Sequence, residues 1–387
     1  MSVIPYGRQS IDRSDIDAVV AVLESDFLTQ GPAVPAFEKA LSTRCGVPYA
    51  IAVNSATSAL HLACLALGVG AGHIVWTSPI SFVASANCAL YCGAKVDFVD
   101  IDPRTYNMSL ERLAAKLEDA EKRGVLPKVL IPVHLCGQPC DMEGIRALSS
   151  RFGFKVVEDA SHAIGATYKG RPIGDCEYSD ITVFSFHPVK IITTAEGGAL
   201  LTRDPKLAKS IQSLRSHGIT RDPSEMDHEP DGPWYYQQVE LGFNYRMTDI
   251  QAALGCSQFR RLDDFVATRD RLAKRYDDLL AEFPVTTPWQ HPDGRSAWHL
   301  YVIRLQQGAA KSRNEVFADL RAAGIGVNIH YIPIYSQPFY RRLGYEFERC
   351  EEAERYYESA ITLPLYPALS EAQQDRVADV LKQSVCK

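Results

Sequence analysis

The chain has 387 residues, 46% hydrophobic and 23% charged, an ordinary composition for a globular protein with one large and one smaller domain. The formal net charge of −6 and the absence of a dense lysine and arginine block argue against nucleic acid or an anionic membrane as the main partner. No signal peptide, membrane-spanning stretch or metal-ligand pattern is evident, so we expect a cytoplasmic protein without a metal site.

Up to about residue 250 the hydrophobic pattern alternates between helical and strand-like segments. The expected helices are 15–25, 59–67 and 83–91. The expected strands are 50–53, 74–77, 96–99, 129–133, 155–157, 181–184 and 198–202. Strands that are apolar on both faces and separated by helices predict an α/β domain over residues 1–250, with a mostly parallel sheet covered by helices on both faces.

The remaining residues, 251–387, predict a smaller α+β domain. A helical pattern from about 248 to 283 is long enough to be a strut between the two domains. It is followed by an expected strand at 299–305, a helix at 313–323 and a strand at 326–329. Residues 222–233, rich in aspartate, proline and glutamate, predict a surface excursion.

Lys190 lies between an expected strand and the turn Glu196-Gly197-Gly198, which leads into the next strand. A lysine that projects from such a turn into a pocket is desolvated, which lowers its pKa and favours imine chemistry. The alternative is a solvated surface lysine, the usual state of this residue.

Asp159 comes at the end of the strand expected at 155–157, where ligands of open parallel sheets gather. A carboxylate there could keep a pyridine ring protonated, as pyridoxal phosphate (PLP) chemistry requires. The alternative is that Asp159 caps a following helix. Glu158 alternates to the other side of the strand, which indicates a structural role.

The run from Asn54 to Ser58 lies at a strand-to-helix junction and contains several short hydroxyl side chains. Free N–H groups at a helix N-terminus bind phosphate, although the same residues could form a plain capping turn. A phosphate turn, then a ring acid, then a lysine is the order that a PLP site on this type of fold requires. We therefore predict PLP as the cofactor, with Lys190 and Asp159 as catalytic residues.

With these residues the sequence resembles the DegT/DnrJ/EryC1/StrS sugar aminotransferase family across nearly the whole chain. The motifs that carry the resemblance are Leu28-Thr29-Gln30-Gly31-Pro32, Asn54-Ser55-Ala56-Thr57-Ser58-Ala59-Leu60, Gly137-Gln138, Glu158-Asp159-Ala160-Ser161-His162, Ser185-Phe186-His187, Glu196-Gly197-Gly198, Arg215-Ser216-His217-Gly218, Asn244-Tyr245-Arg246-Met247 and His330-Tyr331-Ile332-Pro333. The resemblance implies a fold-type I PLP-dependent transferase, similar to aspartate aminotransferase. Two positions depart from the family pattern: His73 stands where relatives often carry an acid, and Ala195 where many carry glycine.

The resemblance also implies roles for individual residues. The implied cofactor-binding residues are Ala56 and Thr57 through their backbone, Ser185 through its hydroxyl, Phe82 on the pyridine face, Asp159 at the ring nitrogen, His162 at the phenolic oxygen, Lys190 at the reactive carbon, and Asn244 at the phosphate of the other subunit. The alternative for Phe82 is a core phenylalanine. The implied substrate-binding residues are Tyr6, Asp26, Phe27, Leu28, Thr29, Ala56, Ser185, Asn244, His330 and Tyr331. A role for Asn244 in the other subunit implies a homodimer with shared active sites.

Within the family the sequence is most similar to the pseudaminic-acid branch, with pointers in the segments 77–84, 187–190 and 234–236. The implied reaction is transfer of an amino group from L-glutamate to the C4 ketone of UDP-2-acetamido-2,6-dideoxy-β-L-arabino-hex-4-ulose. This gives UDP-4-amino-4,6-dideoxy-N-acetyl-β-L-altrosamine and 2-oxoglutarate, with pyridoxamine phosphate as the intermediate form of the cofactor. The alternatives are amination of another nucleotide-linked keto-sugar, a PLP-dependent sugar dehydratase, in which histidine replaces the lysine, and a non-catalytic sensor.

Overall fold

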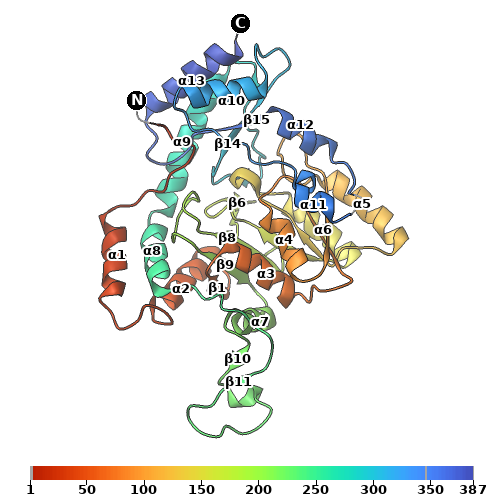
Figure 1. The fold of residues 1–387 in the computed structure, drawn as a ribbon, viewed down its shortest axis with the longest axis vertical. Helices are drawn as coiled ribbons and strands as arrows, with labels where there is room; N and C mark the ends of the chain where they lie inside the picture. The colour runs from red at the N-terminus through yellow and green to blue at the C-terminus, as the bar shows by residue number, and fades with distance from the viewer. Residues whose placement is uncertain (1–2, 345–346, 387) are drawn as a thin grey trace.

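The structure, a computed structural model, describes residues 3–344 and 347–386. A seven-stranded sheet forms the centre of the larger part of the molecule (Figure 1). Across the sheet the strands are β1 (Tyr49–Val53), β9 (Gly198–Thr202), β8 (Ile181–Ser185), β5 (Lys155–Asp159), β4 (Val129–Ile131), β2 (Ile74–Thr77) and β3 (Lys95–Phe98). Strand β9 is antiparallel to both of its neighbours, and the other neighbouring pairs are parallel. The prediction of a mostly parallel sheet is therefore confirmed.

Each face of the sheet packs into its own hydrophobic core. In β1, Ala50 and Ala52 belong to one core, whereas Ile51 and Val53 belong to the other. The helices that contribute to the first core include α2 (Ala33–Cys45), α5 (Leu110–Arg123) and α6 (Met142–Phe152). Those that contribute to the second include α3 (Ala56–Ala66), α4 (Ala84–Tyr91), α7 (Pro205–Arg215) and α12 (Glu351–Ser359). Burial on both faces explains why most residues of these strands are apolar.

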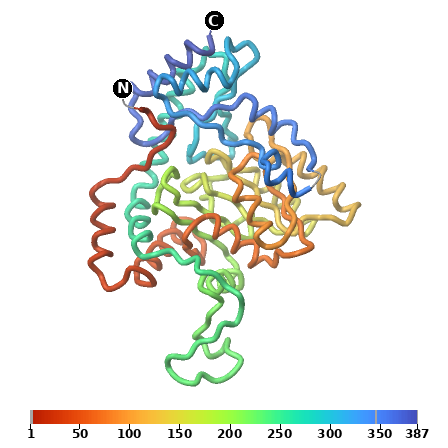
Figure 2. Tube along the Cα trace, viewed as in Figure 1, coloured from red at the N-terminus to blue at the C-terminus, as the bar shows by residue number. Residues whose placement is uncertain are grey.

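The C-terminal part has a third core, formed around the antiparallel sheet β12-β14-β15. Its elements are α9 (Leu262–Leu280), β12 (Val285–Thr286), β14 (Tyr301–Leu305), α10 (Arg313–Ala322), β15 (Ala360–Leu363) and α13 (Glu371–Val385). Figure 2 shows the red N-terminal segment running beside this part before it reaches α1 (Arg13–Leu23). Ile4 pairs with Ile325 and is buried in the third core, so the N-terminal segment packs against the C-terminal part of the molecule.

The single long helix expected over 248–283 is wrong, because the chain breaks it into α8 (Asp249–Phe259) and α9. Arg261, at the break, has non-helical dihedrals, with φ −102° and ψ 8°. Its guanidinium forms ion pairs with Asp12 and Asp15 at the start of α1, at 2.8 and 2.5 Å. A tertiary contact with α1 therefore coincides with the turn that the helical periodicity did not reveal.

The strand expected at 326–329 is also wrong. This segment makes only isolated bridges, at Ile325 with Ile4 and at Asn328 with Thr362. Gly326 lies so close to the N-terminal segment that an added Cβ would be 2.9 Å from the carbonyl oxygen of Ile4. The chain is thus threaded between the N-terminal segment and β15, and no continuous ladder forms.

The excursion expected at 222–233 extends from a two-stranded ribbon that projects away from the main body (Figure 1). The ribbon and the other short elements are β10 (Ile219–Thr220), β11 (Gln237–Gln238), η2 (Pro223–Glu225), η1 (Leu135–Gly137), β6 (Thr167–Tyr168), β7 (Arg171–Pro172), β13 (Gly294–Arg295), η3 (Ile334–Ser336) and α11 (Pro338–Arg342). Among the described residues, no helix combines the length and the apolar character needed to cross a bilayer.

Candidate active site

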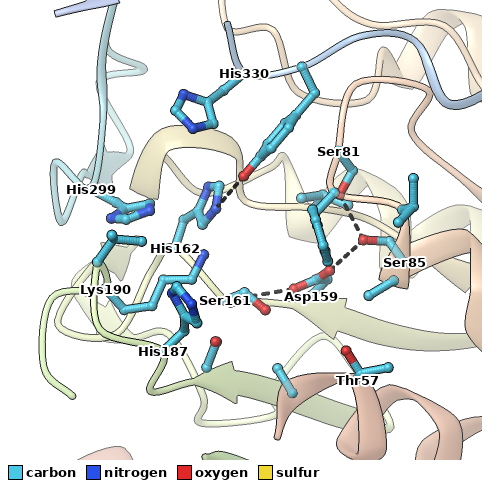
Figure 3. A pocket seen from close by; sticks show the side chains of 18 of the residues that line it. Thr57, Ser81, Ser85, Asp159, Ser161, His162, His187, Lys190, His299 and His330 are labelled. Carbon is cyan, nitrogen blue, oxygen red and sulfur yellow. Dashed lines mark hydrogen bonds between the residues drawn. The ribbon is translucent and has the colours of Figure 1, made fainter. Parts of the chain in front are cut away.

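A cavity of about 620 Å³ opens where β5 and β8 end and α3 begins (Figure 3). The predicted site residues that line it are Tyr6, Ala56, Thr57, Phe82, Asp159, His162, Ser185, Lys190, His330 and Tyr331. Its volume lies within the range of ordinary ligand pockets. The fold therefore brings the phosphate turn, the acid and the lysine together, although they are far apart in the sequence.

Lys190 lies in the turn after β8, and its side chain extends into the cavity beside His162 (Figure 3). Its backbone N–H donates to the carbonyl of His187 at 2.9 Å, which fixes the turn. Burial lowers the pKa of the Lys190 amine to about 8, although the charge of Asp159 opposes that change. The alternative of an ordinary solvated lysine is therefore wrong, and an amine of this pKa is suited to proton transfer near neutral pH.

Asp159 ends β5, and both of its carboxylate oxygens are hydrogen-bonded. The Ser85 hydroxyl donates to Oδ2 at 2.6 Å, and the Ser161 N–H donates to Oδ1 at 3.1 Å. No helix follows β5, because the next described element is the two-residue strand β6, so Asp159 is not a helix cap. Its neighbour Glu158 points away into a buried network, where it accepts hydrogen bonds from His134, at 2.8 Å, and from two hydroxyls. The structural role expected for Glu158 is confirmed.

The turn before α3 caps the helix and also borders the cavity. Ser55 is the N-cap, and its hydroxyl accepts a hydrogen bond from the N–H of Ser58 at 3.1 Å. Ala56 and Thr57, in the first helical turn, line the cavity, and their N–H groups have no acceptor within the helix. A Cβ on Gly198 would lie 2.6 Å from the Ala56 nitrogen, which explains why glycine is needed where β9 passes this turn.

Three histidines on the cavity wall are held neutral. Burial, and then the charge of Lys190, lower the pKa of His162 well below its usual value and that of His330 to about 3. Burial and the neighbouring His162, whose ring centroid is 4.3 Å away, likewise lower the pKa of His299. The Cys136 N–H donates to Nδ1 of His162 at 3.2 Å, so the ring proton lies on Nε2. Nε2 is 3.3 Å from the Tyr331 hydroxyl, so His162 directs a donor into the cavity.

Phe82 is 59% exposed, so it is not the core phenylalanine that was the alternative for it. It lines the cavity, and its ring centroid is 6.4 Å from that of Tyr331. An exposed aromatic ring at the mouth of a cavity is available to stack on a ligand.

The other predicted site residues lie outside the lining of this cavity: Asp26, Phe27, Leu28, Thr29 and Asn244. The Leu28 carbonyl accepts a hydrogen bond from the Asp249 N–H at 3.0 Å, which ties this exposed segment to the start of α8. Asn244 is exposed, and its backbone bridges to Ser216 near the end of β1. One chain therefore does not bring these residues to the site.

Sequence reasoning missed Ser81, Ser85 and His299, which also line the cavity. Ser81 and Ser85 follow β2, one of the parallel strands, so their place at the carboxyl edge of the sheet was a usable signal. His299 precedes β14 in the C-terminal part, and no local pattern connects it to Lys190.

The sequence matches the DegT/DnrJ/EryC1/StrS aminotransferase family over residues 9–382. The chain belongs to this family. It is 39% identical over 386 residues to the spore coat polysaccharide biosynthesis protein SpsC of Bacillus subtilis, covering 99% of this chain and 97% of that one. It is 38% identical over 381 residues to the UDP-4-amino-4,6-dideoxy-N-acetyl-β-L-altrosamine transaminase of Campylobacter jejuni, covering 98% and 96%. It is 37% identical over 383 residues to the GDP-perosamine synthase of Caulobacter vibrioides, covering 98% of each.

Solved structures of similar proteins support the same family assignment. Helicobacter pylori PseC, an aminotransferase involved in the biosynthesis of pseudoaminic acid, is 30% identical, with a TM-score of 0.90 over 99% of both chains. The PLP form of the putative sugar aminotransferase Spr1654 from Streptococcus pneumoniae is 31% identical, with a TM-score of 0.87 over 99% of this chain and 98% of that one. The expected fold-type I architecture is confirmed. The protein is a PLP-dependent aminotransferase of nucleotide-linked sugars.

The polar groups that line the cavity fit PLP as the cofactor. Free N–H groups at the start of α3 suit a phosphate, and Asp159 is an acid for a pyridine nitrogen. The Lys190 amine, whose pKa is lowered to about 8, is suited to imine formation with an aldehyde such as that of PLP.

Proposed function

We propose that the protein transfers the amino group of L-glutamate to the C4 ketone of UDP-2-acetamido-2,6-dideoxy-β-L-arabino-hex-4-ulose. The products are UDP-4-amino-4,6-dideoxy-N-acetyl-β-L-altrosamine and 2-oxoglutarate, and the pathway is pseudaminic acid biosynthesis. The observation that carries the reaction is the shared cavity of Lys190 and Asp159, with the Lys190 pKa lowered to about 8. The sugar is proposed from the similarity to the Campylobacter jejuni transaminase and to PseC.

In this proposal the chain's residues hold the cofactor in one orientation. The N–H groups of Ala56 and Thr57 and the Ser185 hydroxyl would hold the phosphate, and Asp159 would face the ring nitrogen. The Nε2–H of His162 would donate to the phenolic oxygen, since its Nδ1 is already an acceptor. When bound, PLP supplies an electron sink for the substrate carbon that loses a proton.

Lys190 would then move the protons. Its neutral amine would remove the Cα proton of glutamate in the first half-reaction, and its protonated form would donate a proton to the former keto carbon, C4 of the sugar, in the second. A pKa near 8 leaves both the neutral and the charged amine available near neutral pH, so that one group can accept and later donate.

The substrate is tested by incubating the purified holoenzyme with L-glutamate and a panel of UDP-, GDP- and dTDP-linked keto-sugars, with the amino-sugar products identified by NMR. We expect amination at C4 of the UDP-linked substrate, and Lys190→Ala provides the inactive control. Preferential turnover of a GDP- or dTDP-linked sugar would contradict the proposal.

The second candidate function is amination of another nucleotide-linked keto-sugar. The Caulobacter vibrioides GDP-perosamine synthase is nearly as similar as the Campylobacter jejuni enzyme, at 37% against 38% identity. The same panel separates the two candidates, because GDP-linked substrates are in it.

We further propose a homodimer in which each site is completed by the partner chain. Within the cavity lining of the described residues, Lys190 is the one side chain from lysine or arginine, whereas the ligands carry several phosphate and carboxylate charges. Asn244 is exposed and outside the cavity of its own chain, so it is available to a second chain. An apolar surface on α1 and the loop after it supports pairing. The exposed residues of this surface are Ile16, Val20, Leu23, Phe27 and Leu28.

Subunit complementation tests the shared site. Lys190→Ala and Asn244→Ala chains, each impaired alone, are mixed so that heterodimers form. One site of each heterodimer then carries both changes and the other carries neither, so about half of the wild-type activity per heterodimer should return. Demonstrated heterodimers without any recovery would refute the shared site.

A further inference from the structure

The carboxylate of Asp159 is fixed from two directions by different parts of the fold. The Ser161 N–H, two residues along the chain, donates to Oδ1 at 3.1 Å. The Ser85 hydroxyl, from α4, donates to Oδ2 at 2.6 Å (Figure 3). The Ser161 N–H fixes Oδ1, and the Ser85 hydroxyl fixes Oδ2. Because both oxygens are needed to define the plane of the carboxylate, the contact from α4 sets its orientation.

The direction of the hydrogen bonds is set by charge. An ionised carboxylate only accepts, so the Ser85 hydroxyl must donate to Asp159. The Ser81 hydroxyl is 2.7 Å from that of Ser85, whose proton is already committed, so Ser81 donates to Ser85. The result is a chain of two hydroxyls that ends on the Asp159 carboxylate.

These hydroxyls are not accounted for by the stability of the helix itself. Helix α4 begins without a side-chain cap, so neither serine caps its N-terminus. Ser81 and Ser85 are 3% and 1% exposed, and α4 residues around Ser85 are buried in the core. A donor mounted on a buried helix keeps a fixed position, as a supporting hydrogen bond to a functional group requires.

We propose that Ser85, supported by Ser81, is a positioning residue that orients Asp159 toward the pyridine nitrogen of the cofactor. Ser85 acts through Asp159 and touches no reacting atom. The inference rests on the proposed role of Asp159 at the ring nitrogen. Hydrogen bonds to a charged group are among the stronger ones, so loss of this bond should weaken cofactor binding about tenfold or more.

The experiment compares Ser85→Thr with Ser85→Val in the holoenzyme. The two side chains have nearly the same volume, so their difference isolates the hydroxyl. Each variant is stripped of cofactor and titrated with PLP and with deaza-PLP, in which a carbon replaces the ring nitrogen. We expect Ser85→Thr to bind PLP like the wild type and Ser85→Val to bind it about tenfold more weakly. For deaza-PLP, the dissociation constants of the two variants should be nearly equal. The ¹⁵N NMR signal of labelled PLP should also move toward that of an unprotonated ring in Ser85→Val alone.

Equal PLP binding by the two variants would overturn the proposal. So would an equal loss for PLP and deaza-PLP, because a merely structural role does not depend on the ring nitrogen. If Ser85→Val does not fold, as judged by circular dichroism, Ser85→Ala is compared with the wild type in the same two titrations. Asp159→Asn separates the two levels of the argument. If Asp159→Asn loses the same affinity for PLP and for deaza-PLP, the role of Asp159 is wrong. If its loss is specific to PLP but the Ser85 variants show no loss specific to PLP, this inference alone is wrong.

Discussion

The lowered pKa of Lys190 can be measured directly in the protein stripped of its cofactor. Burial lowers that pKa from 10.5 to about 8, with the charge of Asp159 acting in the opposite direction. At pH 8 about half of the Lys190 amines are then neutral, against about 0.3% for a lysine of ordinary pKa. Because only the neutral amine reacts with an acylating reagent, Lys190 should react about 150-fold faster at pH 8 than an equally accessible ordinary lysine.

The assay is competitive acetylation with trace reagent between pH 6 and 11, with each lysine followed by mass spectrometry of its peptide. The native protein should show a labelling midpoint near pH 8 for Lys190. The same peptide in urea should titrate near pH 10.5, the unfolded value. Lys209 is the internal control, because the Glu225 carboxylate raises its pKa.

The sign of the linked stability effect follows from the same pKa. The folded state holds its Lys190 proton less tightly than the unfolded state, so folding is disfavoured while both states are protonated, below about pH 8. That cost disappears as the pH rises toward 10.5. In Asp159→Asn the opposing charge is gone, so the Lys190 midpoint should fall below 8. A native midpoint near 10.5 would refute the conclusion that the amine is desolvated.

Three further predictions concern single residues. Asp159→Asn should slow both half-reactions by about 100-fold or more, and near-normal single-turnover rates would mean that this acid does not serve the cofactor ring. Glu158→Gln should lower the free energy of unfolding by about 1–3 kcal/mol. In His134, Nδ1 accepts from the Cys140 N–H, so the Nε2–H is the donor to Glu158, and in the variant it would face an amide or lose its acceptor. An unchanged denaturation midpoint would contradict this. Ala195 has φ 65°, in the left-handed region, so Ala195→Gly should be neutral or stabilise the fold by up to about 1 kcal/mol, whereas Ala199→Gly in β9, the control, should destabilise it.

The seven-stranded sheet was predictable because its strands are buried on both faces. In β1, consecutive residues enter opposite cores, so the strand is apolar throughout and stands out in the sequence. The two errors arose where a long-range contact decides the local structure. Arg261 breaks a helical pattern beside Asp15, a residue 246 positions away in the chain, and Gly326 is confined by the N-terminal segment. Neither contact has a local signal.

Within the site, the sequence revealed the residues that follow strands of the parallel sheet. Lys190 and Asp159 each come directly after or at the end of such a strand, and parallel strands place these positions along one edge. Asn244 and the segment containing Phe27 were named from the family resemblance alone, and one chain leaves them outside the cavity. Their assignment depends on a second chain, about which the pattern within one chain carries no information.

The surroundings of Asp159 show why the environment of a catalytic group is harder to predict than the group itself. The identity of Asp159 follows from five residues of β5 and the turn after it, whereas its second hydrogen-bond donor, Ser85, is 74 residues away. Serine is a common residue, and a hydroxyl near a helix N-terminus is usually explained as a cap. Helix α4 has no side-chain cap, and the hydroxyl of Ser85 is directed at the acid instead. The sequence contained Ser85 and its approximate place at the edge of the sheet, but only the folded structure reveals that its hydroxyl reaches Asp159.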